Sequence, residues 1–307
     1  PVLRHPKGVL DAVGAPDGTV LVTAAGRRVY LWSREGNVLL AERELDGSAV
    51  NCLALMPGGG GVVAGTGKGL VHFLRFAKLE SAREPLSTGA DAVRVVAWRP
   101  DGEVLAVGLA DGADERTGWV ELRSGQGGVL SRTRTEKCVP GLMKWSPDGS
   151  VLMVGGASPQ FYMLRGEPMA PELTMGSGKL VTTGFLFVSN ERVRVLDYVD
   201  GWQEWDLAKG EKIGKPKEVQ PSCVHIAVAP DGRQYLGVNR SASAYLYDAE
   251  NALVPTRPLS PAFTVSGGYY LDASHVLLTG ENGMAQIRLL RPSVPAVTLA
   301  HTRDDFT

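Results

Sequence analysis

The sequence of 307 residues is poor in cysteine and carries no excess of either charge. Its three cysteines, Cys52, Cys138 and Cys223, are an odd number at wide spacing, so they predict neither a disulfide framework nor a paired metal-ligand motif. We expect free, buried thiols. The 32 Lys and Arg residues against 33 Asp and Glu residues leave a net charge of −1, which gives no global attraction to nucleic acid or to an anionic membrane.

Long apolar runs are also missing from the sequence. No stretch approaches the ~18 apolar residues of a membrane-spanning helix, and the segment Pro1–Lys7 lacks the apolar region of a signal peptide. We therefore expect a cytoplasmic protein that binds neither nucleic acid nor membranes.

The sequence lacks the short motifs that mark common catalytic, phosphate and metal sites. Gly65–Lys68 and Gly176–Lys179 resemble phosphate loops, but each lacks the first glycine of that motif and a Ser or Thr after its lysine. The five histidines show no metal-ligand spacing, and the acidic stretch Asp111–Glu115 lacks the spacing of a calcium loop. We therefore predict no catalytic residue, no cofactor and no metal site.

Glycine is abundant, with 38 residues, and several of these glycines lie in one recurring pattern. Its clearest copy is Lys144–Gly149 (Lys-Trp-Ser-Pro-Asp-Gly), which is followed by the apolar run Val151–Val154. Pro presets φ for a turn position, Asp bonds to the backbone two residues on, and Gly accepts a positive φ. A Pro-Asp-Gly turn between two apolar runs therefore predicts a β-hairpin.

Seven turns of this kind, some of them degenerate, divide the chain. They begin at Pro16, Pro57, Pro100, Pro147, Ser189, Pro230 and Asp272, so successive turns are 41 to 47 residues apart. This spacing is typical of a four-stranded propeller blade. One blade cannot bury a core alone, so neighbouring sheets must stack around an axis. The nearly continuous apolar runs of the sequence support this arrangement, because strands buried on both faces show no alternation of apolar and polar residues.

The predicted fold is all-β: a seven-bladed β-propeller of four-stranded antiparallel blades, in a single domain of residues 1–307. The expected blades cover approximately residues 7–47, 48–89, 90–137, 138–178, 179–221, 222–261 and 262–301. We expect the outermost strand of the seventh blade to come from Val294–His301, because the residues before His5 are too few for a full strand.

Several of these units resemble the WD40 repeat. Trp205–Gly210 (Trp-Asp-Leu-Ala-Lys-Gly) is similar to the tryptophan-aspartate end of the third strand of such a repeat, and Ala97–Gly102 and Ala227–Gly232 resemble its first strand and turn. The resemblance covers essentially the whole chain and implies a propeller that binds protein partners. The family's Gly-His pair survives only as single histidines at His5 and His301, so we expect apolar packing to hold most blades together.

Two functions of different class follow from these observations. The first is a non-catalytic protein–protein interaction scaffold or adaptor that works within a larger complex and presents one propeller face to a protein partner. The second is a propeller enzyme, such as a hydrolase or lactonase, with polar residues or a metal at the central channel. This alternative rests on fold analogy alone. Since no catalytic motif is present, the scaffold is our prediction.

The repeat register indicates where a partner would bind. The residue six before each turn is expected at the channel mouth on the face opposite the turns; these residues are Leu10, Asn51, Arg94, Gly141, Thr183, Val224 and Ser266. A long loop beside Arg94 in the third blade, residues 110–118, adds Asp111, Asp114, Glu115 and Arg116. Loops on a rigid scaffold concentrate binding residues. We predict partner binding by these four loop residues together with Asn51, Arg94, Thr183 and Ser266.

Overall fold

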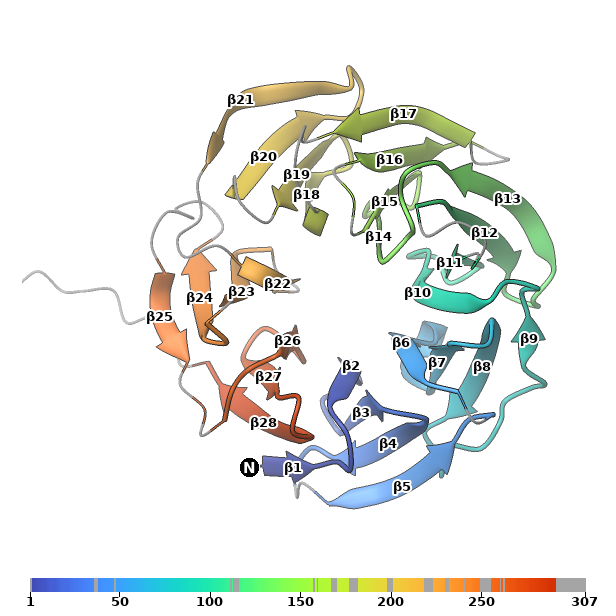
Figure 1. Ribbon diagram of the computed structural model, residues 1–307, viewed down its shortest axis with the longest axis vertical. Coiled ribbons are helices and arrows are strands. Elements are labelled where there is room, and N and C mark those ends of the chain that lie inside the picture. The colour runs from blue at the N-terminus through green and yellow to red at the C-terminus, as the bar shows by residue number, and fades with distance from the viewer. Residues whose placement is uncertain are drawn as a thin grey trace, which may run out of the picture.

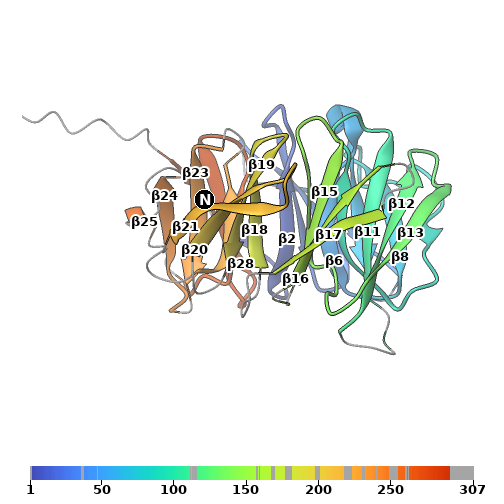
Figure 2. The same cartoon turned by 90° about the horizontal axis from the view of Figure 1, so that it is seen from above.

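The computed structural model of the protein is a ring of seven four-stranded antiparallel sheets around a central channel, which confirms the predicted seven-bladed β-propeller (Figure 1). Figure 2 shows the ring from its edge, with the strands running between its two faces. The structure describes residues 2–35, 38–46, 48–110, 112, 116–156, 158, 160–166, 170–176, 182–197, 201–217, 223–229, 232–239, 241–248, 255–259, 261 and 263–290.

Each of the first six blades runs from the inside of the ring outward in chain order. The strands of blade one are β2 (Val9–Gly14), β3 (Val20–Ala25), β4 (Arg28–Ser33) and β5 (Leu39–Glu44). Those of blade two are β6 (Val50–Leu55), β7 (Gly61–Thr66), β8 (Leu70–Arg75) and β9 (Leu86–Ser87). Those of blade three are β10 (Ala92–Trp98), β11 (Val104–Ala110), β12 (Gly118–Ser124) and β13 (Val129–Thr135). A short 3₁₀ turn, η1 (Pro57–Gly59), joins β6 to β7.

The remaining four blades follow the same order up to the ring closure. Their strands are β14 (Leu142–Trp145), β15 (Val151–Gly155), β16 (Gln160–Arg165), β17 (Ala170–Gly176); β18 (Thr182–Ser189), β19 (Arg192–Asp197), β20 (Gly201–Asp206), β21 (Glu211–Lys217); β22 (Cys223–Val228), β23 (Gln234–Asn239), β24 (Ala244–Asp248), β25 (Pro255–Leu259); β26 (Gly267–Tyr270), β27 (His275–Thr279), β28 (Met284–Leu289) and β1 (Val2–Arg4).

The strand sequences explain their places within a blade. Second strands such as β7 and β15 are buried along their whole length, because other strands and neighbouring blades cover them. Their near-continuous runs of Val, Leu, Ala and Met fit burial on both faces. Outermost strands such as β5 and β21 are mostly exposed and rich in charged side chains. These charged edges discourage pairing with other chains.

The Pro-Asp-Gly turns form as their residues predict. Gly18, Gly102 and Gly149 adopt φ of +73°, +76° and +72°, the left-handed region that favours glycine. Neighbouring turns touch: a Cβ at Gly102 would lie 2.6 Å from Cβ of Pro57, and one at Gly149 would lie 2.8 Å from Cγ of Arg99. All these turns therefore share one face of the ring, here called the turn face.

Seven apolar clusters fill the described core, and each lies between two neighbouring blades. The cluster between blades three and four, for example, joins Val104 and Leu122 to Trp145 and Leu152. The blades are thus held to one another by side chains that no single blade could bury alone. Cys52, Cys138 and Cys223 are buried thiols that form no disulfide, as predicted.

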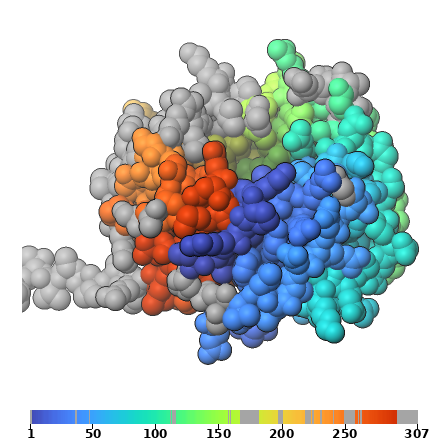
Figure 3. Space-filling view, turned by 60° about the horizontal axis from the view of Figure 1, so that its bottom comes forward, coloured from blue at the N-terminus to red at the C-terminus, as the bar shows by residue number. Residues whose placement is uncertain are grey.

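The predicted ring closure is wrong. The outermost strand of blade seven is β1, which pairs antiparallel with β28 through Val2–Gln286, Leu3–Ala285 and Arg4–Met284. Figure 3 shows the N-terminal segment lying against the last described strands. Three residues suffice for this strand because Leu3, only 1% exposed, anchors it in the core between blades seven and one. The segment Val294–His301 lies outside the described residues.

A buried hydrogen-bond network reinforces this closure. Thr23 Oγ1 accepts from Nε1 of Trp32 at 2.9 Å and lies 2.8 Å from Nε2 of His5. Nδ1 of His5 is 3.0 Å from the carbonyl oxygen of Gly283, which also accepts from the His5 backbone N–H at 2.8 Å. Burial lowers the pKa of His5, so the neutral ring is favoured. Blade one therefore holds a His-Thr-Trp network in addition to its apolar packing.

Candidate functional site

Three of the predicted partner-binding side chains bond to backbone carbonyls of the propeller itself. Asn51 Nδ2 donates to the carbonyl oxygen of Val93 at 2.8 Å, which ties blade two to blade three. The hydroxyl of Thr183 donates to the carbonyl of Leu196 at 3.3 Å, and that of Ser266 to the carbonyl of Thr279 at 3.2 Å. In this structure these three side chains support the strands at the face opposite the turn face.

Arg94 is the remaining mouth residue that was predicted to bind a partner. It is exposed on β10, where the pairing register with β11 shifts between Val93 and Val95. In the neighbouring loop, Asp111, Asp114 and Glu115 lie outside the described residues, whereas Arg116 is described and exposed. Asp91 holds the described part of this loop, since its Oδ2 accepts from the backbone N–H of Gly112 at 2.6 Å. The binding role of Arg94 and this loop stays a prediction.

A polar cluster in the channel, which no motif of the sequence indicates, is formed by Asp11 on β2, His225 on β22 and Tyr269 on β26. Asp11 accepts two backbone N–H groups, from Ala12 and Leu53, each at 2.7 Å. The Tyr269 hydroxyl donates to the carbonyl of Leu10 at 3.0 Å, and its ring meets the His225 ring edge-on at 5.3 Å between centroids. These residues come from blades one, six and seven, so the fold alone brings them together.

Burial shifts the pKa values of this cluster in opposite senses. Desolvation raises the pKa of Asp11 to about 7 despite its two backbone hydrogen bonds, and desolvation lowers the pKa of His225 to about 4. The folded state thus holds a proton on Asp11 that the unfolded chain releases between about pH 4 and 7. It also leaves His225 neutral between about pH 4 and 6.5, where the same histidine would be protonated in the unfolded chain.

We expect these two groups to have opposite effects on the pH dependence of stability. Asp11 makes the free energy of unfolding fall as pH rises from about 4 to 7, whereas His225 makes it fall as pH drops from about 6.5 to 4. Relative to the wild type, Asp11→Asn should therefore gain stability with rising pH, and His225→Gln should lose it. Each difference has a slope of at most about 1.4 kcal/mol per pH unit. Urea unfolding at pH 4.5, 5.5, 6.5 and 7.5 measures these slopes; parallel profiles for all three proteins would contradict the expectation.

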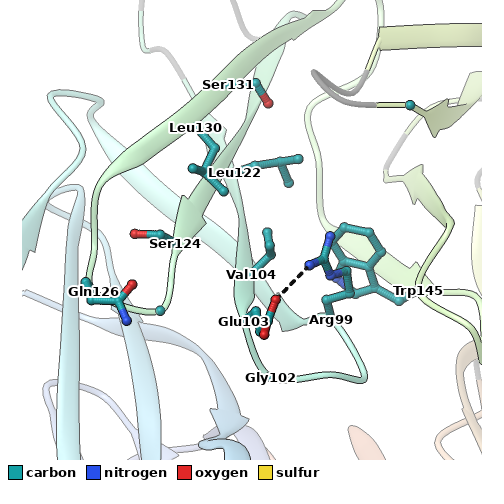
Figure 4. Close-up of a pocket in the computed structure, with 12 residues that line it drawn as sticks. Arg99, Gly102, Glu103, Val104, Leu122, Ser124, Gln126, Leu130, Ser131 and Trp145 are labelled. Atoms are coloured by element: carbon teal, nitrogen blue, oxygen red, sulfur yellow. Dashed lines mark ion pairs between the residues drawn. The ribbon is translucent and has the colours of Figure 1, made fainter.

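A groove of about 820 Å³ opens between blades three and four on the turn face (Figure 4). Its apolar floor is the outer end of the core between these blades, and Leu130 of β13, 55% exposed, stands above it. Arg99 pairs with Asp101 at 2.7 Å and with Glu103 at 3.7 Å along one side. The lining residues are Arg99, Gly102, Glu103, Val104, Leu122, Ser124, Gly125, Gln126, Leu130, Ser131, Trp145 and Gly166.

A second hollow, of about 700 Å³, lies where the central channel reaches the turn face. It is here called the turn-face mouth. Its lining comes from the innermost strands and turns of blades three to seven and comprises Ala97, Trp98, Pro100, Met143, Lys144, Trp145, Ser146, Pro147, Phe185, Leu186, Phe187, Val228, Ala229, Gly232 and Tyr270. Trp145 lines both hollows, so groove and mouth adjoin across β14.

Neither hollow was predicted from the sequence, although signals for both exist. Val129 and Leu130 begin an outermost strand with two adjacent exposed apolar residues, as Leu39 and Leu40 do on β5. Lys144 stands three residues before its turn, a position that is Val13, Ala54, Ala97 and Ala227 in other blades. Lysine at this otherwise apolar repeat position could therefore have indicated the turn-face mouth.

Within the described residues, no group of three or more His, Cys, Asp and Glu side chains is arranged to hold a metal ion. The part of the chain that the structure describes also contains no helix long and apolar enough to cross a membrane.

The chain thus has the fold of a seven-bladed propeller with two adjoining hollows on one face. No protein-family model and no curated protein sequence matches it. Among solved structures, it is similar to a chain in the "Crystal Structure of Mitotic Checkpoint Complex", with a TM-score of 0.77 and 14% sequence identity. The match covers 95% of this chain and 91% of the other. At this level of identity the likeness shows the fold.

Proposed function

We propose that the protein is a divergent WD40-type propeller that acts as a non-catalytic scaffold for protein partners within a larger complex in the cytoplasm. The observation that carries this proposal is the groove between blades three and four, an open hollow with an apolar floor and a rim of paired charges. Exposed apolar surface rimmed by polar groups is typical of protein-binding sites. The structural neighbour, a chain of a mitotic checkpoint complex, is consistent with this role.

The groove is suited to an apolar side chain of a partner. Val104, Leu122 and Trp145 form a floor that is already part of the rigid core, so binding requires little rearrangement of the blades. Leu130 would lose its remaining exposed surface on contact with a partner. Burying a leucine and excluding water from such a floor contributes about 1.5–3 kcal/mol, the scale of one interface anchor.

The channel cluster supports a second candidate function, a propeller enzyme. Groups with shifted pKa values gathered in a channel are frequent at active sites, and Asp11 and His225 are such groups. Their geometry favours the scaffold, because both oxygens of Asp11 and the hydroxyl of Tyr269 already bond to backbone groups. A catalytic base would need a free oxygen within reach of a substrate proton.

We expect Leu130→Glu to abolish capture of the protein's partners from an extract of the source organism. The added carboxylate would place a charge against the apolar floor, while exposure of the native side chain keeps the effect on folding within about 0.5 kcal/mol. Leu289→Glu is the matched control, because Leu289 is 58% exposed on blade seven. Partners identified by mass spectrometry should be retained by this control. Equal capture by both variants would show that the groove is not the docking site.

A further inference from the structure

The turn-face mouth combines an aromatic wall with one positive charge. Trp98, Phe185, Phe187 and Tyr270 supply rings from three different blades. Lys144, from β14, is exposed and is the only charged side chain among the lining residues. The hollow therefore presents a cation within mainly apolar surroundings.

Lys144 makes no hydrogen bond or ion pair with any described residue. The carboxylates of the nearest turns are already engaged. Asp101 bonds to Arg99 and to the backbone N–H of Glu103, and Asp148 accepts from the hydroxyls of Ser146 and Ser150. Desolvation by the surrounding protein lowers the pKa of Lys144 although the residue is exposed to the hollow, so its ammonium is less hydrated than that of an ordinary surface lysine. An anion that enters the mouth would stabilise the positive charge of Lys144 in place of the missing water.

Trp98, which also lines the hollow, carries a buried donor. Nε1 of Trp98 is buried and has no acceptor among the described residues, whereas Nε1 of Trp145 donates to the carbonyl of Ala97 at 3.2 Å. Lys144 thus lacks an acceptor among the described residues, and none of the described residues that line the mouth is a carboxylate.

We propose that the turn-face mouth binds a segment of a partner protein in which a Glu or Asp side chain lies between apolar side chains. The carboxylate pairs with Lys144, while the apolar neighbours pack on the aromatic wall. A hollow of about 700 Å³ has the size of a ligand pocket that holds a few side chains. This site is distinct from the groove between blades three and four and does not depend on it.

The test uses capped tripeptides that differ in one group. Leu-Glu-Phe, Phe-Glu-Leu and Trp-Glu-Leu are compared with their Gln counterparts, by following the indole N–H signals of the ¹⁵N-tryptophan-labelled protein in NMR titrations. We expect the Glu peptides to bind about tenfold more tightly, the scale of one charge-assisted hydrogen bond. The Trp98 signal should shift most, and added salt should reduce the preference.

Lys144→Met tests the assigned cation. It should abolish the preference for Glu over Gln and leave the melting temperature equal or higher, since a poorly hydrated charge is removed. Lys209→Met, at an exposed position of blade five, is the matched control and should keep the preference. Equal binding of Glu and Gln peptides, binding of none of them, or an unchanged preference in Lys144→Met would each overturn the proposal. Self-association that Lys144→Met abolishes in sedimentation velocity would replace the partner segment by a second copy of this chain.

Discussion

Deletion of residues 1–6 is expected to open the ring and lower the free energy of unfolding by about 4 kcal/mol. The deletion removes β1, the outermost strand of blade seven, together with Leu3 and His5. Burial of one leucine contributes about 1.5–3 kcal/mol, and each buried hydrogen bond of His5 contributes about 1 kcal/mol. Thermal unfolding followed by circular dichroism measures the loss, as does the fraction of soluble protein.

Two further variants keep this prediction testable if the deletion protein does not fold. Leu3→Ala leaves the strand in place and should cost about 2–4 kcal/mol, because it creates a cavity between blades seven and one. Deletion of residues 292–307 removes no strand of the described propeller and should leave the melting temperature nearly unchanged. If the C-terminal deletion unfolds the protein while the N-terminal one does not, our assignment of the closing strand is mistaken.

The closing strand shows the limit of periodicity as a guide to fold. Seven turns 41 to 47 residues apart fix the number of blades, because each turn carries its own local chemistry in Pro, Asp and Gly. A strand of three residues has no such signal. Val2–Arg4 pairs with residues 284–286, which lie near the other end of the chain. The spacing of the repeats does not indicate contacts between segments so far apart in the sequence.

The candidate site was less predictable than the fold for a similar reason. The register placed Asn51, Thr183 and Ser266 at one end of the innermost strands, but it did not show that their side chains bond to backbone carbonyls of neighbouring strands. The groove forms only where blades three and four pack side by side. Leu130 is exposed because blade four does not cover this part of blade three. Such surfaces arise from packing between units and are not encoded in any one repeat.

A buried ion pair lies on the third strand of blade three, at the seam with blade two. Glu121 and Arg123, both on β12, have side chains only 3% and 8% exposed, and Oε1 of Glu121 lies 2.5 Å from Nε of Arg123. Arg123 also donates to the carbonyl oxygens of Gly127, at 3.0 Å, and of Ser87 on β9, at 2.9 Å. Burial, followed by the nearby charge of Arg123, lowers the pKa of Arg83. Glu121 is thus the carboxylate that compensates Arg123 in this seam.

Glu121→Ala should destabilise the protein by about 3–5 kcal/mol, because it leaves the Arg123 guanidinium buried without its counter-charge. The double variant Glu121→Ala, Arg123→Met removes both charges and should recover most of this loss. Glu44→Ala, which breaks the exposed pair with Arg28 at 3.2 Å, is the control and should cost less than about 1 kcal/mol. Urea unfolding of the four proteins at pH 7 measures these differences. A loss for Glu121→Ala no larger than that for Glu44→Ala would mean that solvent reaches Arg123, and that this seam is more open than its packing indicates.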